Sequence, residues 1–114
     1  MTARRQALGA AGEAQAARWY EARGYTVLAR NWRSGRGELD LVLGKDGVVV
    51  FCEVKTRTSD AFGAPVEAVT RTKQVRIRRL AAAWIDLAPT RPREVRFDVA
   101  SVLAGHLDVV EGAF

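Results

Sequence analysis

The central stretch of the sequence reads Gly37-Glu38-Leu39-Asp40-Leu41-Val42-Leu43, then Gly44-Lys45-Asp46-Gly47, then Val48-Val49-Val50-Phe51-Cys52-Glu53-Val54-Lys55. Two apolar runs flank a turn, and Asp-Gly in that place is typical of a two-residue type I′ hairpin. Each run also carries charge, because Asp40 interrupts the first and Glu53 and Lys55 end the second. An ionised carboxylate is costly to bury unless it is paired or bound to a metal. The stretch therefore predicts an antiparallel hairpin that carries a charged site.

The register of this hairpin decides whether the charged side chains meet. With Asp46 and Gly47 as the loop, Asp40 lies directly opposite Glu53. A four-residue loop, residues 44–47, would move the partners by two residues. Both registers keep Asp40, Glu53 and Lys55 on one face, because side chains along a strand alternate between faces. Only a bulge or a one-residue slip would separate them.

Length and charge limit the class of protein. At 114 residues we expect a single domain, residues 1–114. The net charge of +5 and the isoelectric point near 10.1 favour an anionic partner, with nucleic acid as the first candidate. Fifteen of the 18 basic residues are Arg, which suits bidentate contacts with phosphate. A genome whose base composition favours Ala and Arg codons is the alternative explanation.

Cysteine usage and hydropathy indicate the compartment. Cys52 is the only cysteine and lies in an apolar run, so we expect a buried thiol in a reducing environment. No apolar run approaches the ~18 residues of a membrane span, and the Ala-rich start differs from the apolar core of a signal peptide. We therefore expect a cytoplasmic protein without a membrane partner.

The first third of the chain predicts a helix, a short strand and a basic loop. The helix covers residues 7–23 and ends at Gly24. Its main apolar stripe at helical spacing is Leu8, Ala11, Gln15, Trp19 and Ala22. Glu13 lies on a second flank with Ala16, Ala17 and Tyr20, where it is either a solvated helix residue or close to another element. Residues 25–29 form the strand, and residues 31–37 form the loop.

After the hairpin, the sequence predicts a second helix and two more strands. A polar loop, residues 56–63, precedes Pro65, which suits the first turn of a helix. The helical stripe is Val66, Val69, Lys73, Ile77, Leu80, Trp84 and Leu87. Lys73 interrupts this stripe, either as a snorkelling side chain or because it reaches toward the site or a phosphate. A linker, residues 89–93, leads to strands at residues 94–102 and 107–110.

Asp40, Glu53 and Lys55 have the chemistry of a metal-dependent site. Adjacent carboxylates repel, which raises the pKa of one of them, and they are the hard oxygen ligands that Mg²⁺ or Mn²⁺ prefers. Such an ion polarises a phosphodiester and activates water, and Lys55 would orient that water or stabilise charge on the phosphate. The alternative is an ion-pair cluster with no ligand. A Ser/His/Asp site is excluded as a pattern, because His106 is the only histidine.

These residues resemble a known superfamily. Asp40 followed by Glu53-Val54-Lys55, after a helix bearing Glu13, resembles the PD-(D/E)XK restriction-endonuclease-like superfamily, and within it the archaeal Holliday-junction resolvases. Further motifs are similar to the YraN-type family of uncharacterised bacterial proteins. They are Gly12-Glu13 with Ala16-Ala17, Asn31-Trp32-Arg33, Gly37-Glu38-Leu39-Asp40-Leu41, Glu53-Val54-Lys55-Thr56-Arg57, Phe62-Gly63-Ala64-Pro65 and Arg96-Phe97-Asp98-Val99.

The resemblance implies a fold and a set of roles. The fold is α/β and restriction-endonuclease-like, with a central mixed sheet of about five strands flanked by helices. Asp40, Glu53, the Val54 carbonyl and Glu13 would bind Mg²⁺ or Mn²⁺, and Lys55 would be the catalytic lysine. Leu39 stands where the superfamily name has proline. A resolvase cuts two strands and needs two sites, so the resemblance implies a homodimer only if this chain shares that activity.

Three functions remain open from the sequence. The first is a Mg²⁺-dependent endonuclease that acts on DNA, including branched or structured DNA. Its phosphate contacts would come from Arg33, Arg36, Arg57, Lys73 and Arg76, and such contacts carry no sequence information. The second is a non-catalytic nucleic-acid-binding or recombination and repair accessory protein with the same fold. The third is a protein-interaction domain, which leaves the basic charge unexplained.

Overall fold

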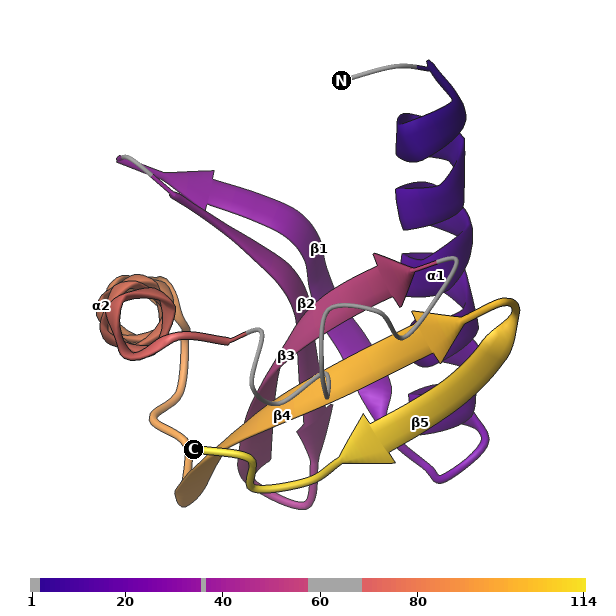
Figure 1. Ribbon diagram of the computed structural model, residues 1–114. Coiled ribbons are helices and arrows are strands. Elements are labelled where there is room, and N and C mark those ends of the chain that lie inside the picture. Colours follow the sequence, from indigo (N-terminus) through magenta and orange to yellow (C-terminus); the bar gives the residue numbers. More distant parts are fainter. Residues whose placement is uncertain (1–2, 36, 58–68) are drawn as a thin grey trace.

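A five-stranded mixed sheet lies between two helices (Figure 1). The computed structural model describes residues 3–35, 37–57 and 69–114. The expected α/β architecture, a mixed sheet of about five strands flanked by helices, is confirmed. In chain order the elements are α1 (Ala3–Glu21), β1 (Thr26–Ser34), β2 (Gly37–Lys45), β3 (Val48–Arg57), α2 (Arg71–Leu87), β4 (Glu94–Leu103) and β5 (His106–Val110).

The strands stand in chain order across the sheet, β1-β2-β3-β4-β5. Three neighbouring pairs are antiparallel, and β3 with β4 is the parallel pair. Parallel neighbours need a crossover connection, and α2 lies in that connection between β3 and β4. The predicted hairpin is β2 and β3. Its loop is the two-residue one, since Lys45 pairs with Val48, and Asp46 and Gly47 have the positive φ angles, 51° and 80°, of a type I′ turn.

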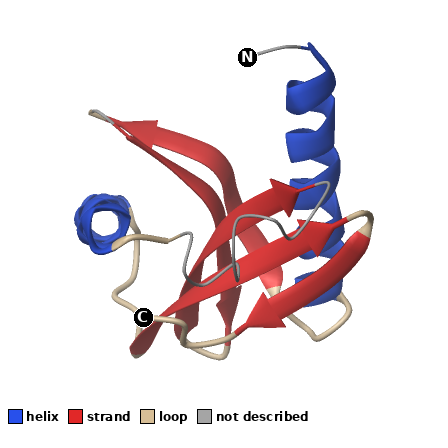
Figure 2. Cartoon of the chain, viewed as in Figure 1, coloured by secondary structure: helices blue, strands red, loops and turns tan. Residues whose placement is uncertain are grey.

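The two helices cover opposite faces of the sheet (Figure 2). Ile77, Leu80 and Ala81 of α2 pack into one cluster with buried residues of β2, β3 and β4. On the other face, α1 packs Ala16, Ala17 and Tyr20, all 0% exposed, into a second cluster. The predicted stripe of α1 was therefore wrong. Ala11 and Ala22 are exposed, and the flank that also carries Glu13 is the buried one. Small side chains let the helix approach the sheet closely, and their burial decides the orientation of α1.

Two element boundaries differ from the predictions. The expected basic loop at residues 31–37 is for the most part strand, because β1 continues to Ser34 and pairs with β2 down to Ser34–Gly37. The second helix begins at Arg71, where the Thr70 side chain accepts a hydrogen bond from the Lys73 N–H as its N-cap. Pro65 and Val66 lie outside the described residues. Lys73, Ile77, Leu80 and Trp84 face the protein as predicted, whereas Leu87 is 76% exposed.

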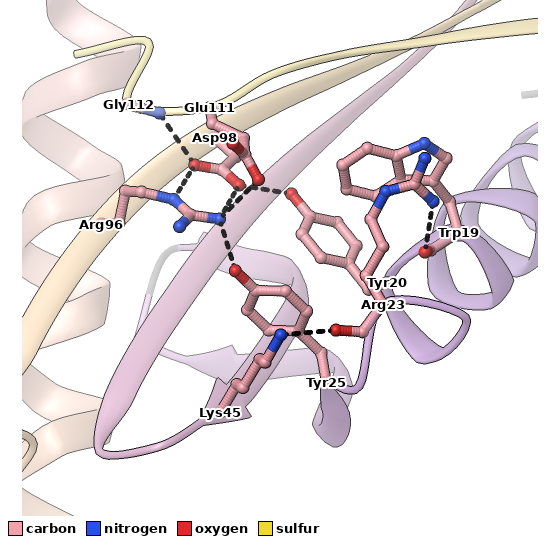
Figure 3. A network of polar contacts seen from close by, with 9 residues as sticks. All are labelled: Trp19, Tyr20, Arg23, Tyr25, Lys45, Arg96, Asp98, Glu111 and Gly112. Carbon is pink, nitrogen blue, oxygen red and sulfur yellow. Dashed lines mark hydrogen bonds and ion pairs between the residues drawn. The ribbon is translucent and has the colours of Figure 1, made fainter.

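A buried carboxylate joins α1, β4 and the C-terminal segment (Figure 3). Asp98 is 0% exposed and accepts from the Tyr20 hydroxyl at 2.5 Å, from the Gly112 N–H at 3.0 Å and from Arg96 at 2.8 and 2.9 Å. The same guanidinium donates to the Tyr25 hydroxyl. Pairing a buried charge in this way satisfies it, so the network fixes the end of α1 and residues 111–112 against the sheet.

Cys52 is buried and not in a disulfide, as predicted. Burial, above all, raises the pKa of its thiol to about 12, which makes it an inert core residue. No helix in the described ranges is long and apolar enough to cross a membrane.

Candidate functional site

The site lies where the hairpin opens. The last pair of the β2–β3 ladder is Leu41 with Cys52, so Asp40 and Glu53 occupy the next position in the predicted register. Beyond this pair, Asp40 Oδ2 accepts a hydrogen bond of 2.8 Å from the Val54 N–H. A side chain thus takes the place of a ladder partner. Because the N–H and C=O of one strand residue point to the same side, the Val54 carbonyl faces the same opening.

Glu53 and Lys55 lie beside this opening as an ion pair. The Lys55 Nζ is 3.3 Å from Glu53 Oε1, and the side chains are 22% and 16% exposed. Both share the face of β3 that carries Phe51, which packs in the α2 cluster. From α2, Lys73 reaches the same place and lies close enough to Lys55 for each to shift the pKa of the other. Of the two interpretations of Lys73, the structure supports the one in which it reaches the site.

Glu13 approaches from the helix on the other face. Gly12 packs so closely on β3 that a Cβ there would stand 2.3 Å from Thr56 Oγ1. This contact brings the following residue, Glu13, close to Glu53 and Glu38, whose charges act on it. Glu13 also hydrogen-bonds with the Asn31 side chain. It is therefore partly buried at the site and not a solvated helix residue.

Asp40 and Glu13 hold their protons more tightly than usual. Burial first, and the charge of Glu53 second, raise the pKa of Asp40 from 3.8 to about 7, although the Val54 N–H opposes the shift. Burial also raises the pKa of Glu13, against the effect of its hydrogen bond with Asn31. Like charges at short range produce this effect in paired carboxylates. Without a cation, the site is electrostatically unfavourable when fully ionised.

The pKa values of Lys55 and Lys73 are shifted in opposite directions. Burial alone would lower the pKa of Lys55, but the hydrogen bond with Lys73 and the charges of Glu53 and Asp40 raise it. The pKa of Lys73 is lowered, chiefly by its hydrogen bond with Lys55 and then by burial. Lys55 therefore stays an ammonium next to the carboxylates, and Lys73 is the partner that gives up its proton more easily.

The oxygen donors come from three elements. Asp40, Glu53, the Val54 carbonyl and Glu13 are hard ligands of the kind that Mg²⁺ and Mn²⁺ take. Among the described residues, no three His, Cys, Asp or Glu side chains converge closely enough to form a ready-made cage. Two carboxylates and a carbonyl, completed by water and substrate oxygens, are the usual environment for Mg²⁺, which keeps several water ligands. The donor chemistry fits such an ion.

The residues predicted to bind phosphate separate into groups. Arg76 lines a small cavity of about 70 Å³ together with Lys73 and Glu53, next to the site. Arg33 lies on β1, where its side chain is 82% exposed and pairs with Glu38 at 3.2 Å. Arg57 ends β3, and its carbonyl accepts from the Ala104 N–H. Arg36 lies outside the described residues.

Two residues near these elements were not predicted from the sequence. Asn31 stands opposite Asp40, between the pairs Arg30–Leu41 and Trp32–Leu39, and its φ of 49° lies in the left-handed region that asparagine tolerates. No local signal singled it out, because residues 31–37 were predicted to be a loop. Like Asn31, Asp98 was noticed only as part of a family motif, although an Asp within the apolar run of β4 indicates a buried, paired carboxylate.

Comparison with known proteins identifies a family. Residues 12–102 match the model of the uncharacterised protein family UPF0102. The chain belongs to this family. A UPF0102 protein of Beutenbergia cavernae is 56% identical over 99 residues, which are 87% of this chain and 84% of the relative. UPF0102 proteins of Frankia alni and Nocardia farcinica are 52% and 49% identical, covering 86% and 94% of this chain and 82% and 86% of theirs.

The part of the chain that matches UPF0102 contains the whole candidate site. The matched residues, 12–102, begin at Gly12, which packs against Thr56. They include Glu13, Asp40, Glu53 and Lys55. The expected membership of the YraN-type uncharacterised family is thereby confirmed.

Proposed function

We propose that this UPF0102 protein is a Mg²⁺- or Mn²⁺-dependent endonuclease that hydrolyses phosphodiester bonds in DNA. The observation that carries the proposal is the meeting of Asp40, Glu53 and Lys55 at the opening of the hairpin, with Glu13 brought to the same place by α1. The resemblance of these positions to the motif of the PD-(D/E)XK superfamily supports it.

The shifted pKa values agree with a cation-binding role. A carboxylate whose pKa is raised to about 7 by burial and by another carboxylate lies where a positive charge would be stabilising. Asp40 and Glu53 would hold the ion, with the Val54 carbonyl, and Glu13 would reach it directly or through water. When bound, the ion polarises a phosphodiester and lowers the pKa of a coordinated water.

The lysines and Arg76 supply positive charge of their own. The Lys55 ammonium, held by Glu53 at 3.3 Å, can donate to a non-bridging phosphate oxygen and stabilise the charge that develops there. Lys73 and Arg76 line the adjoining cavity and can bind a neighbouring phosphate. Such contacts fix the position of a strand without reading its sequence.

Cleavage assays test this proposal. Labelled linear, flap and four-way-junction DNA is incubated with protein in Mg²⁺, in Mn²⁺ or in EDTA. We expect metal-dependent cutting that falls by about 100-fold or more in Glu53→Ala and Lys55→Ala, the usual cost of removing a group that stabilises a transition state. Asp108→Ala is the matched control, since Asp108 is an exposed carboxylate on β5.

Two other outcomes would contradict the proposal. Binding that is sensitive to salt but comes without cutting, and is unchanged in both variants, would instead support the nucleic-acid-binding accessory function. If the protein binds no nucleic acid at all, both functions are wrong.

A further inference from the structure

A groove runs along one face of α2, next to the site. It has a volume of about 870 Å³ and lies between α2 and the joined ends of β1 and β2, which extend over the α2 side of the sheet in Figure 1. Its charged and apolar lining residues on α2 are Arg71, Val75, Arg76, Arg79, Leu80 and Ala83. From Arg71 to Ala83 the helix rises about 18 Å at 1.5 Å per residue, so the groove is elongated.

The strand side of the groove depends on a glycine. A Cβ on Gly37 would stand 2.7 Å from Leu80 Cδ1 and 3.4 Å from Arg76 Cδ. The first residue of β2 therefore lies directly against α2, and any larger side chain there would enter the groove. The start of β2 and the helix α2 thus form two sides of the groove.

The lining combines an apolar floor with cationic groups. Val75, Leu80 and Ala83 contribute the apolar surface, and Val75 is one of the large apolar side chains that remain exposed, at 42%. Arg71, Arg76 and Arg79 provide the charge, and the described lining includes no carboxylate. A groove with this chemistry suits a polyanion that also carries flat apolar groups, such as rings.

The groove adjoins the candidate site. Arg76 and Leu80 line both the groove and the small cavity that contains Glu53 and Lys73. A chain that lies in the groove thus passes two residues that also line the cavity beside Glu53.

We propose that this groove binds a single-stranded segment of nucleic acid and leads it to the site; this inference rests on the proposed nuclease function. In a duplex the bases are stacked inside, and the phosphates would face Val75 and Ala83, whose apolar side chains cannot hydrogen-bond or pair with them. In a single strand the bases can lie on the apolar floor or stack on guanidinium planes while the arginines bind phosphates. The substrate class is DNA with an unpaired segment, such as a single-stranded flap.

The test measures binding without cleavage. Fluorescence anisotropy in EDTA compares a labelled single strand of about 12 nucleotides with a blunt duplex of the same length, within the usual site size for single strands. We expect Val75→Gln and Arg79→Ala each to weaken single-strand binding by about 3- to 10-fold, the effect of losing one base or phosphate contact. Duplex binding should change by less than about 2-fold.

The controls remove equivalent groups elsewhere. Leu87→Gln changes an apolar side chain on the same helix that is 76% exposed, and Arg91→Ala removes an exposed arginine from the linker before β4. Neither residue lines the groove, so both variants should bind the single strand like the wild type.

Four results would overturn the inference in distinguishable ways. Unchanged single-strand binding in both groove variants would show that the groove stays empty. An equal loss for strand and duplex would show backbone contacts without a preference for unpaired DNA. Sedimentation in which Val75→Gln dissociates a dimer at unchanged affinity would make the groove an interface between copies. Failure of the wild type to bind any nucleic acid would instead reject the proposed function itself.

Discussion

Replacing Asp40 by asparagine should stabilise the metal-free protein at high pH. An acid whose pKa is higher in the folded than in the unfolded chain stabilises the fold through its proton. That stabilisation is complete below the unfolded pKa and is lost as the pH rises through the folded pKa. For Asp40 these values are 3.8 and about 7, so the loss falls between about pH 4 and pH 8.

The structure gives the size of the effect. A difference of about three pKa units at 1.36 kcal/mol each corresponds to ~4 kcal/mol between the protonated and ionised forms. The Asp40 side chain can relax toward water when it ionises, which reduces this figure, so we expect a gain of ~2 kcal/mol for Asp40→Asn at about pH 9. Asparagine keeps a carbonyl oxygen that can accept from the Val54 N–H. At about pH 3.5, below the unfolded pKa of 3.8, Asp40 is mostly protonated in both states and the two proteins should unfold alike.

Urea unfolding in EDTA at both pH values measures this difference. Asp86→Asn is the control, because Asp86 is an exposed carboxylate in the last turn of α2 and should show no such gain. Added Mg²⁺ should raise the stability of the wild type at the higher pH and leave Asp40→Asn nearly unchanged. A loss of more than about 1 kcal/mol in Asp40→Asn at high pH would refute the reasoning, since Asp40 would then belong to a stabilising ion-pair cluster.

Three further predictions concern packing and burial. Gly12→Ala should lower the free energy of unfolding, measured by thermal melts, by about 1–3 kcal/mol, because its Cβ would meet Thr56 Oγ1 at 2.3 Å. Gly9→Ala is the control. A Cβ on Gly9 has no atom within 4 Å, so this variant should raise the free energy of unfolding by about 0.5–1 kcal/mol. Asp98→Ala should cost about 3–5 kcal/mol in urea unfolding, because it leaves a guanidinium without its buried partner. Cys52, with a thiol pKa of about 12, should resist alkylation until the protein unfolds, so labelling of the native protein at about pH 8 would contradict its burial.

The hairpin was predictable because every local signal agreed. The Asp46-Gly47 dipeptide, the apolar runs and the alternation all specify the same turn and register, and the structure has that register from Lys45–Val48 to Leu41–Cys52. What the sequence could not show is that the ladder ends there. Beyond the opening, the start of β2 lies against α2, with Gly37 next to Leu80, and a tertiary contact of this kind is not visible in the sequence.

The orientation of α1 shows the limit of periodicity. Alanine occurs on every side of this helix, so the apolar stripe around Trp19 and the flank around Tyr20 differ little in hydropathy. Close packing decided between them, because Ala16 and Ala17 allow the sheet to approach. For the same reason the sequence left two positions open for Glu13, in solvent or close to another element. Only the packing of α1 decides between them.

The break in the hairpin and the candidate site have one cause. Continued pairing would set Asp40 directly across from Glu53, and like charges at such positions destabilise a sheet. Opening the strands relieves this repulsion but leaves the Val54 N–H without its ladder partner, which is costly in a partly buried strand. The Asp40 carboxylate satisfies that N–H at 2.8 Å and thereby stays next to Glu53, with its pKa raised. The opening thus keeps two carboxylates and a carbonyl together around a space, an arrangement that a cation would stabilise and that a regular hairpin would not provide.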